Sequence, residues 1–405
     1  MKNKKKVDLA INGGKKVRKR DLPPRKAFGL NELESIVQLF KLYNKKGVDF
    51  GYQGYFEKRY TRDFVKYMGG IGYADVVCTG TAAIYVSLAS LQLSPGTHVL
   101  VSPVTDPGTI NAIILNQLVP VLVDAENNSF NIDPFDFKNR ITEKTKAAII
   151  VHVAGKAAKV DLICDIAKKE RIIIIEDCSQ AHGAKLKNKL VGNFGDIAVF
   201  STMYRKNHAT GGCGGVIYTK NKDLYNLARS YADRGKPFHS LNFNEKDPST
   251  FLFPALNLNI DELSCAVGIS TLKKLNTTIK KRISFLKKLE KSLLEKSRCC
   301  KLSKISNFDS PFFHPIEIDL TKISCSKEQF ALSVVSEGIN INPNYKYVVC
   351  EWPWVKQYLF DDYYCTQAIN YRMNSFNLLF NENYGDQEIN DIIKAIVKVE
   401  NYFLK

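Results

Sequence analysis

The sequence lacks any hydrophobic run long enough to cross a membrane. No apolar stretch approaches the roughly 20 residues that a membrane-spanning helix needs, although 45% of the 405 residues are hydrophobic. The first residues, Met1 to Lys6, are rich in lysine and have no apolar core of the kind found in a signal peptide. We therefore expect a cytoplasmic protein that has no membrane partner.

The sequence also lacks the closely paired cysteines of a disulfide-rich or zinc-binding protein. Its ten cysteines are scattered, no Cys-x-x-Cys pair occurs, and none has a metal-like spacing from the six histidines. The adjacent residues Cys299 and Cys300 match no site pattern, and vicinal cysteines are usually packing residues. These features predict buried free thiols and no metal site.

Acidic residues are scarce relative to basic ones. The 41 Asp and Glu residues against 58 Lys and Arg residues give a net charge of +17, which raises nucleic acid as a possible partner. The basic residues are spread along the chain apart from clusters at 2–6 and 15–20, and no zinc finger, RNP-like or basic-helix pattern accompanies them. We therefore expect no nucleic acid partner. An anionic substrate such as a nucleotide sugar would fit the charge, as would a composition that is simply rich in lysine.

The stretch from Ile172 to Gly215 contains the strongest pattern in the chain. It opens with four apolar residues, Ile172 to Ile175, that show no polar alternation, which is typical of a parallel strand covered on both faces. The run ends at Glu176 and Asp177. Because ligands bind at the carboxyl ends of strands in open α/β sheets, Asp177 is placed where a ligand would lie. A carboxylate there is poorly solvated and needs a cationic partner.

A second apolar run, Ile197 to Phe200, ends in Ser201. Lys206 follows, and a glycine-rich turn at 211–215 leads into the strand Val216 to Tyr218. Pyridoxal phosphate requires such a set, namely a lysine amine, a carboxylate for the pyridine nitrogen, and hydroxyl or N–H groups for the phosphate. Taken singly, each feature has an ordinary explanation as a helix cap, a solvated lysine or a turn. Their conjunction favours the cofactor.

The order of these motifs resembles the DegT/DnrJ/EryC1/StrS aminotransferases, which are pyridoxal phosphate enzymes that mostly act on keto-sugars. The resemblance rests on Glu176-Asp177-x-x-Gln180-Ala181-His182-Gly183-Ala184, then Gly195-Asp196 and Phe200-Ser201, then Lys206-Asn207 before the glycine turn. The segment Leu9 to Arg18 is similar to the leader of one branch of that family. The resemblance extends along most of the chain.

The resemblance implies roles for individual residues. Lys206 would form the Schiff base with the cofactor, and Asp177 would hold the proton on its ring nitrogen. Gln180 would lie against the ring or its phenolic oxygen, and Ser201 would bind the phosphate. The remaining cofactor-binding residues implied by the family are Gly80, Thr81 and Ala82 at a strand-to-helix turn, and Asn257, which would reach the phosphate of the neighbouring subunit in a homodimer with shared sites.

The expected fold is α/β and aspartate-aminotransferase-like, which is pyridoxal phosphate fold type I. Strands alternate with helices as far as about residue 260, which predicts a mostly parallel sheet flanked by helices. We expect a large cofactor-binding domain with its leader at 1–260, and linking helices with a smaller C-terminal α+β domain at 261–405. Two linking helices are predicted, over 261–275 and 277–297.

The implied activity is transfer of an amino group, from glutamate or glutamine, to a keto-sugar or cyclitol ketone, with a nucleotide-linked sugar as the expected substrate. Two alternatives remain at this point, a pyridoxamine phosphate-dependent sugar dehydratase and a member without turnover that regulates or binds. His208 bears on the first, because a dehydratase branch has histidine in place of the lysine. Asp106, where many relatives have a ring-stacking aromatic residue, is either a loop cap or a cofactor contact, and His152 is either structural or functional.

Overall fold

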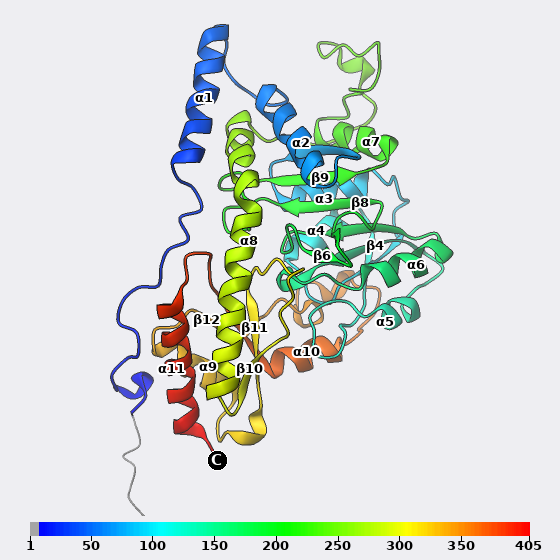
Figure 1. The fold of residues 1–405 in the computed structure, drawn as a ribbon. Coiled ribbons are helices and arrows are strands. Elements are labelled where there is room, and N and C mark those ends of the chain that lie inside the picture. The colour runs from blue at the N-terminus through cyan, green and yellow to red at the C-terminus, as the bar shows by residue number, and fades with distance from the viewer. Residues whose placement is uncertain (1–7) are drawn as a thin grey trace, which may run out of the picture.

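The computed structural model describes residues 8–405, so Met1 to Lys6 and the lysine cluster at 2–6 lie outside the described part. Figure 1 shows a large sheet with helices on both faces, a smaller sheet below it, and one long helix that runs beside both. Among residues 8–405, every helix is too short or too polar to traverse a bilayer.

The helices and strands follow the alternation predicted from the sequence. The helices are α1 (Leu30–Lys46), α2 (Tyr55–Tyr67), α3 (Gly80–Ala89), α4 (Pro107–Leu115), α5 (Pro134–Asn139), α6 (Val160–Glu170), α7 (Lys222–Ala232), α8 (Glu262–Lys296), α9 (Lys327–Ser336), α10 (Thr366–Met373) and α11 (Asp386–Phe403). The strands are β1 (Tyr73–Val77), β2 (His98–Val101), β3 (Val119–Leu122), β4 (Thr145–Val151), β5 (Ile173–Asp177), β6 (Lys185–Leu186), β7 (Lys189–Leu190), β8 (Ile197–Ser201), β9 (Gly215–Thr219), β10 (Cys300–Leu302), β11 (His314–Ile318), β12 (Ile341–Asn342) and β13 (Ser375–Leu378).

The large sheet has seven strands in the order β1-β9-β8-β5-β4-β2-β3. The pairs from β8 to β3 are parallel, whereas β9 is antiparallel to both β8 and β1. The prediction of a mostly parallel sheet is therefore confirmed. Because β1, β5 and β8 run the same way, the residues that follow their last positions meet at one edge.

The two faces of this sheet are both buried, which explains the uninterrupted apolar runs. On β8, Ala198 and Phe200 pack into a core with α2 and α8, whereas Ile197 and Val199 face a second core with α3 and α4. Ile174 on β5 belongs to a third core that lies under α6. Covering both faces leaves only the strand ends accessible, and this confines a ligand site to the sheet edge.

A smaller antiparallel sheet, in the order β10-β11-β13-β12, lies near the C-terminus and packs with α8 and α9, which in turn pack against α11. The N-terminal leader also packs here. Arg18 forms ion pairs with Glu388 (3.0 Å) and Asp391 (2.7 Å) of α11. Glu337 accepts hydrogen bonds from the backbone N–H groups of Ala10 and Val17. The leader thus lies beside α9 and α11 of the C-terminal part. The division of the chain at residue 260 stays a prediction.

The prediction of two linking helices was wrong, because α8 is one continuous helix of 35 residues. Polar residues near Asn276 suggested a break, but Leu275, Thr278 and Ile279 are buried at helical spacing across it. Asn276 lies on the outer side, where it accepts a hydrogen bond from the Tyr67 hydroxyl (3.2 Å). Packing thus overrides the weak local propensity of an Asn-Thr-Thr stretch.

Candidate active site

A pocket of about 220 Å³ opens at the edge where β1, β5 and β8 end. Asp177 ends β5 and Ser201 ends β8, while Gly80 and Thr81 begin the helix that follows β1. The residues that border the pocket include Thr79, Gly80, Thr81, Ile84, Thr105, Asp106, Gly108, Thr109, Val151, Asp177, Ser179, Gln180, Ser201, Met203, Lys206, Cys213 and Gly214. Six of the predicted site residues, from Gly80 to Lys206, are therefore brought together here.

The start of α3 forms one wall of the pocket. The Thr79 side chain accepts a hydrogen bond from the N–H of Ala82 (2.9 Å) and so caps the helix. Ala82 is therefore committed to the cap and does not border the pocket, while Gly80 and Thr81 do. A Cβ atom at Gly80 would lie 2.6 Å from Ser201 Cβ, so only glycine allows this close approach. The positive end of a helix and nearby hydroxyls together suit an anion such as a phosphate group.

Asp177 is buried at the centre of the sheet edge, with 4% of its surface exposed. Its Oδ1 atom accepts a hydrogen bond from the N–H of Ser179 (2.9 Å). Burial raises the pKa of the Asp177 carboxyl, while hydrogen bonds from Ser179 and the charge of Lys206 oppose the rise. A cation bound in this pocket would stabilise the ionised carboxylate further.

Lys206 extends into the pocket from the turn after β8. Its amine lies 4.6 Å from the centre of the Phe312 ring. Burial lowers the pKa of the Lys206 amine, and the charges of Asp177 and Asp106 oppose that shift. An amine whose pKa lies closer to neutrality is more often unprotonated, and only the unprotonated form is a nucleophile or base.

The neighbours of Lys206 point elsewhere. The Asn207 amide donates to Ser310 Oγ (3.0 Å) and to the Pro311 carbonyl (3.3 Å). His208 is fully buried, with its ring nitrogens 2.5 Å from Tyr60 Oη and 3.0 Å from Thr271 Oγ1. Lys206 is therefore the residue of this turn that can react with a ligand in the pocket.

Two open questions from the sequence have structural answers. Asp106 is the N-terminal cap of α4, since its carboxylate accepts from the Gly108 N–H (2.9 Å), although it also borders the pocket. His152 is structural: it is fully buried, 3.2 Å from Glu176 and with Nδ1 accepting from the Ala158 N–H (3.0 Å).

His152, Glu176 and Cys178 have ligand-type atoms within 4.8 Å of one another. The Glu176 oxygens already accept three backbone hydrogen bonds, from the N–H groups of Gly192, Phe194 and Gly195. These hydrogen bonds are sufficient to stabilise the buried Glu176 carboxylate, so no metal ion is needed to account for it.

Gln180 and Asn257 have different positions relative to the pocket. Gln180 borders it, and its Oε1 atom accepts from the Ala154 N–H (2.9 Å). Asn257 is exposed and borders a separate pocket of about 560 Å³, which shares Cys213 with the first one. Its Oδ1 atom accepts from the Asn259 side chain (2.7 Å). Its role across a subunit interface stays a prediction.

A larger cavity of about 750 Å³ adjoins the first pocket, and both are bordered by Asp106, Gln180, Met203 and Lys206. Sequence reasoning missed several of its residues, including Arg25, Phe312 and Tyr347. They come from the N-terminal segment and the C-terminal part of the chain, far from the motifs around Lys206. No local pattern could have identified them.

The donor set of the first pocket fits pyridoxal phosphate. It offers one amine, one buried carboxylate, and the hydroxyls of Thr81 and Ser201 beside a helix start, which match the reactive carbonyl, the ring nitrogen and the phosphate respectively. A Cβ atom at Gly80 would collide with Ser201, and one at Gly108 would collide with Thr81. The two glycines therefore keep side-chain atoms away from the hydroxyls of Ser201 and Thr81.

Comparisons with known proteins identify a family and several relatives. The sequence model of the DegT/DnrJ/EryC1/StrS aminotransferase family matches residues 43–397. The spore coat polysaccharide biosynthesis protein SpsC of Bacillus subtilis is 25% identical over 354 residues, which are 84% of this chain and 88% of that protein. The GDP-perosamine synthase of Escherichia coli O157:H7 is 31% identical over 212 residues, so the match spans 52% of this chain and only 56% of that relative.

A solved structure shows the same fold. The Helicobacter pylori aminotransferase involved in the biosynthesis of pseudoaminic acid superposes with a TM-score of 0.84 at 20% identity, over 95% of this chain and 100% of that one. The predicted aspartate-aminotransferase-like fold is therefore confirmed.

Proposed function

The chain belongs to the DegT/DnrJ/EryC1/StrS aminotransferase family, and we propose that it transfers an amino group from glutamate or glutamine to a keto-sugar or cyclitol ketone, with pyridoxal phosphate as its cofactor. A nucleotide-linked keto-sugar is the proposed acceptor. The observation that carries the proposal is the convergence of the Lys206 amine and the Asp177 carboxylate on one pocket that adjoins a larger cavity.

When bound, pyridoxal phosphate supplies a carbonyl carbon that an amine can attack and a ring that withdraws electrons from the substrate carbon. Asp177 would hold a proton on the ring nitrogen, and that positive charge would in turn stabilise the buried carboxylate. The hydrogen bonds from Ser179 support this role, because they orient the carboxylate and favour its ionised form.

Lys206 would have two roles. Its amine would hold the cofactor covalently in the resting enzyme, and once the amino donor replaces it, the same nitrogen would carry a proton. It would take this proton from the Cα atom of the donor, and in the second half-reaction it would deliver one to the acceptor carbon. The lowered pKa of Lys206 supports both roles, because both need an amine that can release its proton.

Thr81 at the start of α3 and Ser201 at the end of β8 would bind the phosphate through their hydroxyls. Gly80 lets α3 and β8 approach each other closely at this point. Gln180 would fix one side of the ring. The larger cavity would take the sugar, since it adjoins the Lys206 amine and is bordered by polar residues such as Asn340 and Asn342 as well as by aromatic rings.

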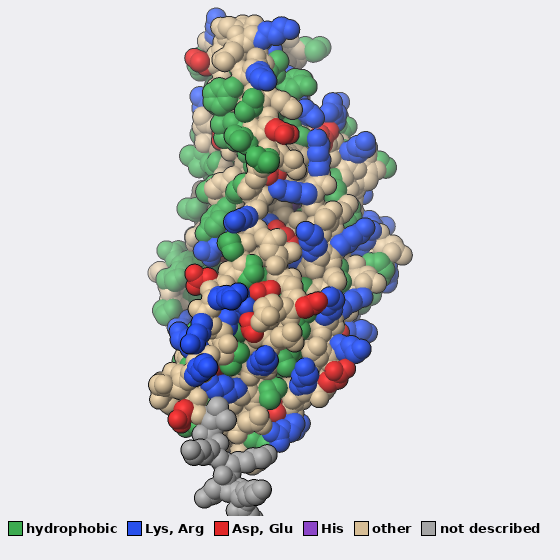
Figure 2. Space-filling model, turned by 60° about the vertical axis from the view of Figure 1, so that its left-hand side comes forward, with side chains coloured by type: hydrophobic (Ala, Val, Ile, Leu, Met, Phe, Trp, Pro, Cys, Tyr) green, Lys and Arg blue, Asp and Glu red, His purple; other side chains and the backbone are tan. Residues whose placement is uncertain are grey.

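We propose a homodimer as the working form. Exposed apolar residues occur along one side of α1 at Leu30, Leu33, Val37 and Phe40. In Figure 2, hydrophobic side chains gather on the upper part of the face, while Lys and Arg side chains are scattered over it. An apolar helix side of this kind suits a second copy of the chain. A cytoplasmic location is part of the same proposal and rests on the ten free cysteines.

The position of His208 bears on the dehydratase alternative. A histidine that acted in place of lysine would have to reach the pocket, yet His208 is held by Tyr60 and Thr271 in the interior. Lys206 borders the pocket instead. These positions favour amino transfer.

The test is a screen of free and nucleotide-linked keto-sugars with nitrogen-labelled glutamate and glutamine. The proposal predicts label in the sugar product for at least one acceptor, and loss of that label in Lys206→Ala. Deoxygenation of a sugar without transfer of label would support the dehydratase instead.

A further inference from the structure

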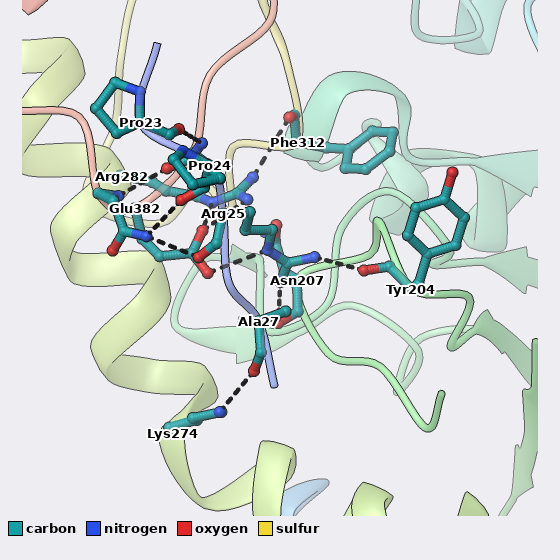
Figure 3. Close-up of polar contacts among 12 residues, drawn as sticks. Pro23, Pro24, Arg25, Ala27, Tyr204, Asn207, Lys274, Arg282, Phe312 and Glu382 are labelled. Carbon is teal, nitrogen blue, oxygen red and sulfur yellow. Dashed lines mark hydrogen bonds and ion pairs between the residues drawn. The ribbon is translucent and has the colours of Figure 1, made fainter. Parts of the chain in front are cut away.

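Two arginines from distant parts of the chain share one carboxylate beside the Lys206 turn (Figure 3). Arg25 Nε lies 3.1 Å from Glu382 Oε1, while Arg282 donates to Glu382 Oε2 through Nη2 (2.8 Å) and Nε (3.0 Å). The three side chains are only 18%, 2% and 12% exposed for Arg25, Arg282 and Glu382. Two mostly buried guanidinium groups share one carboxylate here, so their remaining N–H donors need other hydrogen-bond acceptors. Backbone carbonyls provide these acceptors.

Arg25 donates to carbonyls on either side of Lys206. Its Nη1 atom donates to the Tyr204 carbonyl (2.9 Å) and its Nη2 atom to the Asn207 carbonyl (3.3 Å). Within that turn, the N–H of Lys206 donates to the Met203 carbonyl (2.8 Å). One planar guanidinium therefore bridges the backbone around the reactive lysine, a geometry that its fixed fork of donors allows.

Arg282 reaches Lys206 by a second route. It extends from α8, and its Nη1 atom donates to the carbonyls of Pro311 (3.0 Å) and Phe312 (3.4 Å). The Phe312 ring lies 4.6 Å from the Lys206 amine. Glu382 thus joins one arginine that holds the backbone around Lys206 and another that holds the backbone at Phe312, whose ring lies beside the Lys206 amine.

The segment that carries Arg25 is itself tied down. Asn381 donates to the Pro23 carbonyl (2.8 Å), Asn383 donates to the carbonyls of Pro24 (2.9 Å) and Arg25 (2.7 Å), and the Lys274 amine donates to the Ala27 carbonyl (2.7 Å). These contacts fix the backbone on both sides of Arg25, so its side chain is held in place before any ligand binds.

The charges make Glu382 the centre of the arrangement. Burial lowers the pKa of Arg282 to about 10, with the Arg25 charge adding to the shift and the Glu382 charge opposing it. Without the Glu382 charge, two cations would face each other in a poorly solvated site and would separate.

We propose that Arg25, Arg282 and Glu382 form a positioning cluster that holds the Lys206 amine in place for its reaction with the cofactor. The proposal rests on the assignment of Lys206 as the cofactor lysine. All three act through the Tyr204–Asn207 backbone or through Phe312, so they are positioning residues. Arg25 and Arg282 also border the larger cavity, and a direct contact with the substrate is the competing explanation that the test separates.

The test compares Arg25→Ala, Arg25→Lys and Glu382→Gln with the control Arg20→Ala, which removes an exposed cation from the same N-terminal segment. One readout is hydrogen exchange of the amides at 203–208 in the enzyme without cofactor. The other readout is the rate at which added pyridoxal phosphate becomes covalently attached to the protein. The absorption spectrum of the cofactor monitors this rate. We expect faster exchange and attachment slowed roughly 10- to 100-fold in Arg25→Ala and Glu382→Gln, because small misplacements of a reacting group have effects of that size.

Arg25→Lys should fall between the wild type and Arg25→Ala, since an ammonium keeps the charge but cannot bridge both carbonyls. If Arg25→Ala and Glu382→Gln match Arg20→Ala in both readouts, the proposal is wrong. A rise in KM for the sugar alone, with exchange and attachment unchanged, would also overturn it and assign Arg25 to the substrate.

Failure of the proposed function gives a different result. In that case the wild type attaches the cofactor to another lysine or to none, while exchange at 203–208 still reports whether the cluster holds the turn. If Glu382→Gln does not fold, Arg25→Ala and Arg25→Lys decide the outcome by the same two readouts.

Discussion

The Nε2 atom of His208 lies 2.5 Å from the Tyr60 hydroxyl, in the interior between α2 and α8. The ring also lies near the rings of Phe64, which is tilted against it, and His182, which meets it edge-on, and its other nitrogen is 3.0 Å from Thr271 Oγ1. Only two residues earlier in the chain, Lys206 borders the candidate cofactor pocket. The turn therefore separates a structural histidine from a lysine that is available for chemistry.

Replacing His208 should reduce stability and leave the attachment of the cofactor intact. In His208→Ala the Tyr60 and Thr271 hydroxyls lose a buried partner, so we expect the free energy of unfolding to fall by about 1–3 kcal/mol. Urea unfolding measures this loss, and absorption after addition of pyridoxal phosphate measures attachment. A variant of normal stability that no longer attaches the cofactor would assign His208 to the chemistry.

Asp177→Asn should lower turnover far more than cofactor occupancy. The amide keeps an oxygen that can accept from Ser179, but it cannot hold a proton on the ring nitrogen by charge. We expect kcat to fall on the order of a thousandfold. Steady-state kinetics beside an absorption measurement of bound cofactor gives both quantities, and near-normal turnover would make Asp177 a structural cap.

The free energy of unfolding should depend on pH through His182. Its Nε2 atom donates to the Ser201 carbonyl (2.8 Å), and burial lowers its pKa from 6.5 to about 4. Between these values the unfolded chain binds a proton that the native protein does not. Stability from this residue is thus fully present above about pH 6.5 and is lost as pH falls towards 4, by about 3 kcal/mol.

The measurement is urea unfolding of the cofactor-free protein at several pH values in that range. His182→Gln removes the titrating group, so its stability should depend less steeply on pH than that of the wild type. The control is His239→Gln, which replaces an exposed histidine. Equal slopes for all three proteins would contradict the assignment.

Shared active sites make a prediction about mixed subunits. If Asn257 reaches the partner's cofactor phosphate, a dimer of one Lys206→Ala subunit and one Asn257→Asp subunit has one site with both changes and one with neither. Mixing two inactive variants should therefore restore part of the activity. No recovery, despite demonstrated exchange of subunits and inactive parents, would place Asn257 in the site of its own subunit.

The sequence predicted the parts of the fold that follow local patterns. Ile172 to Ile175 and Ile197 to Phe200 had no polar alternation, and both form strands covered on two faces. Their ends bring Asp177 and Ser201 to one sheet edge, because parallel strands end on the same side. The pocket residues on these ends were predictable for that reason.

Other features depend on contacts between distant segments, which no local pattern reports. Leu275 and Ile279 keep α8 continuous through packing, although the Asn-Thr-Thr sequence at 276–278 suggested a break between two helices. Asn381 and Asn383, from the other end of the chain, help to hold the N-terminal segment that places Arg25 near Lys206. Such positions come from tertiary packing and could not be inferred from residue spacing.

The central claim is that Lys206 holds the cofactor, and borohydride reduction of the enzyme after addition of pyridoxal phosphate tests it most directly. Peptide mapping then identifies the labelled lysine. The account predicts a pyridoxyl group on Lys206 in the wild type and no label in a folded Lys206→Ala variant. A pyridoxyl group on any other lysine in the wild type, or an unchanged label in the variant, would contradict the account.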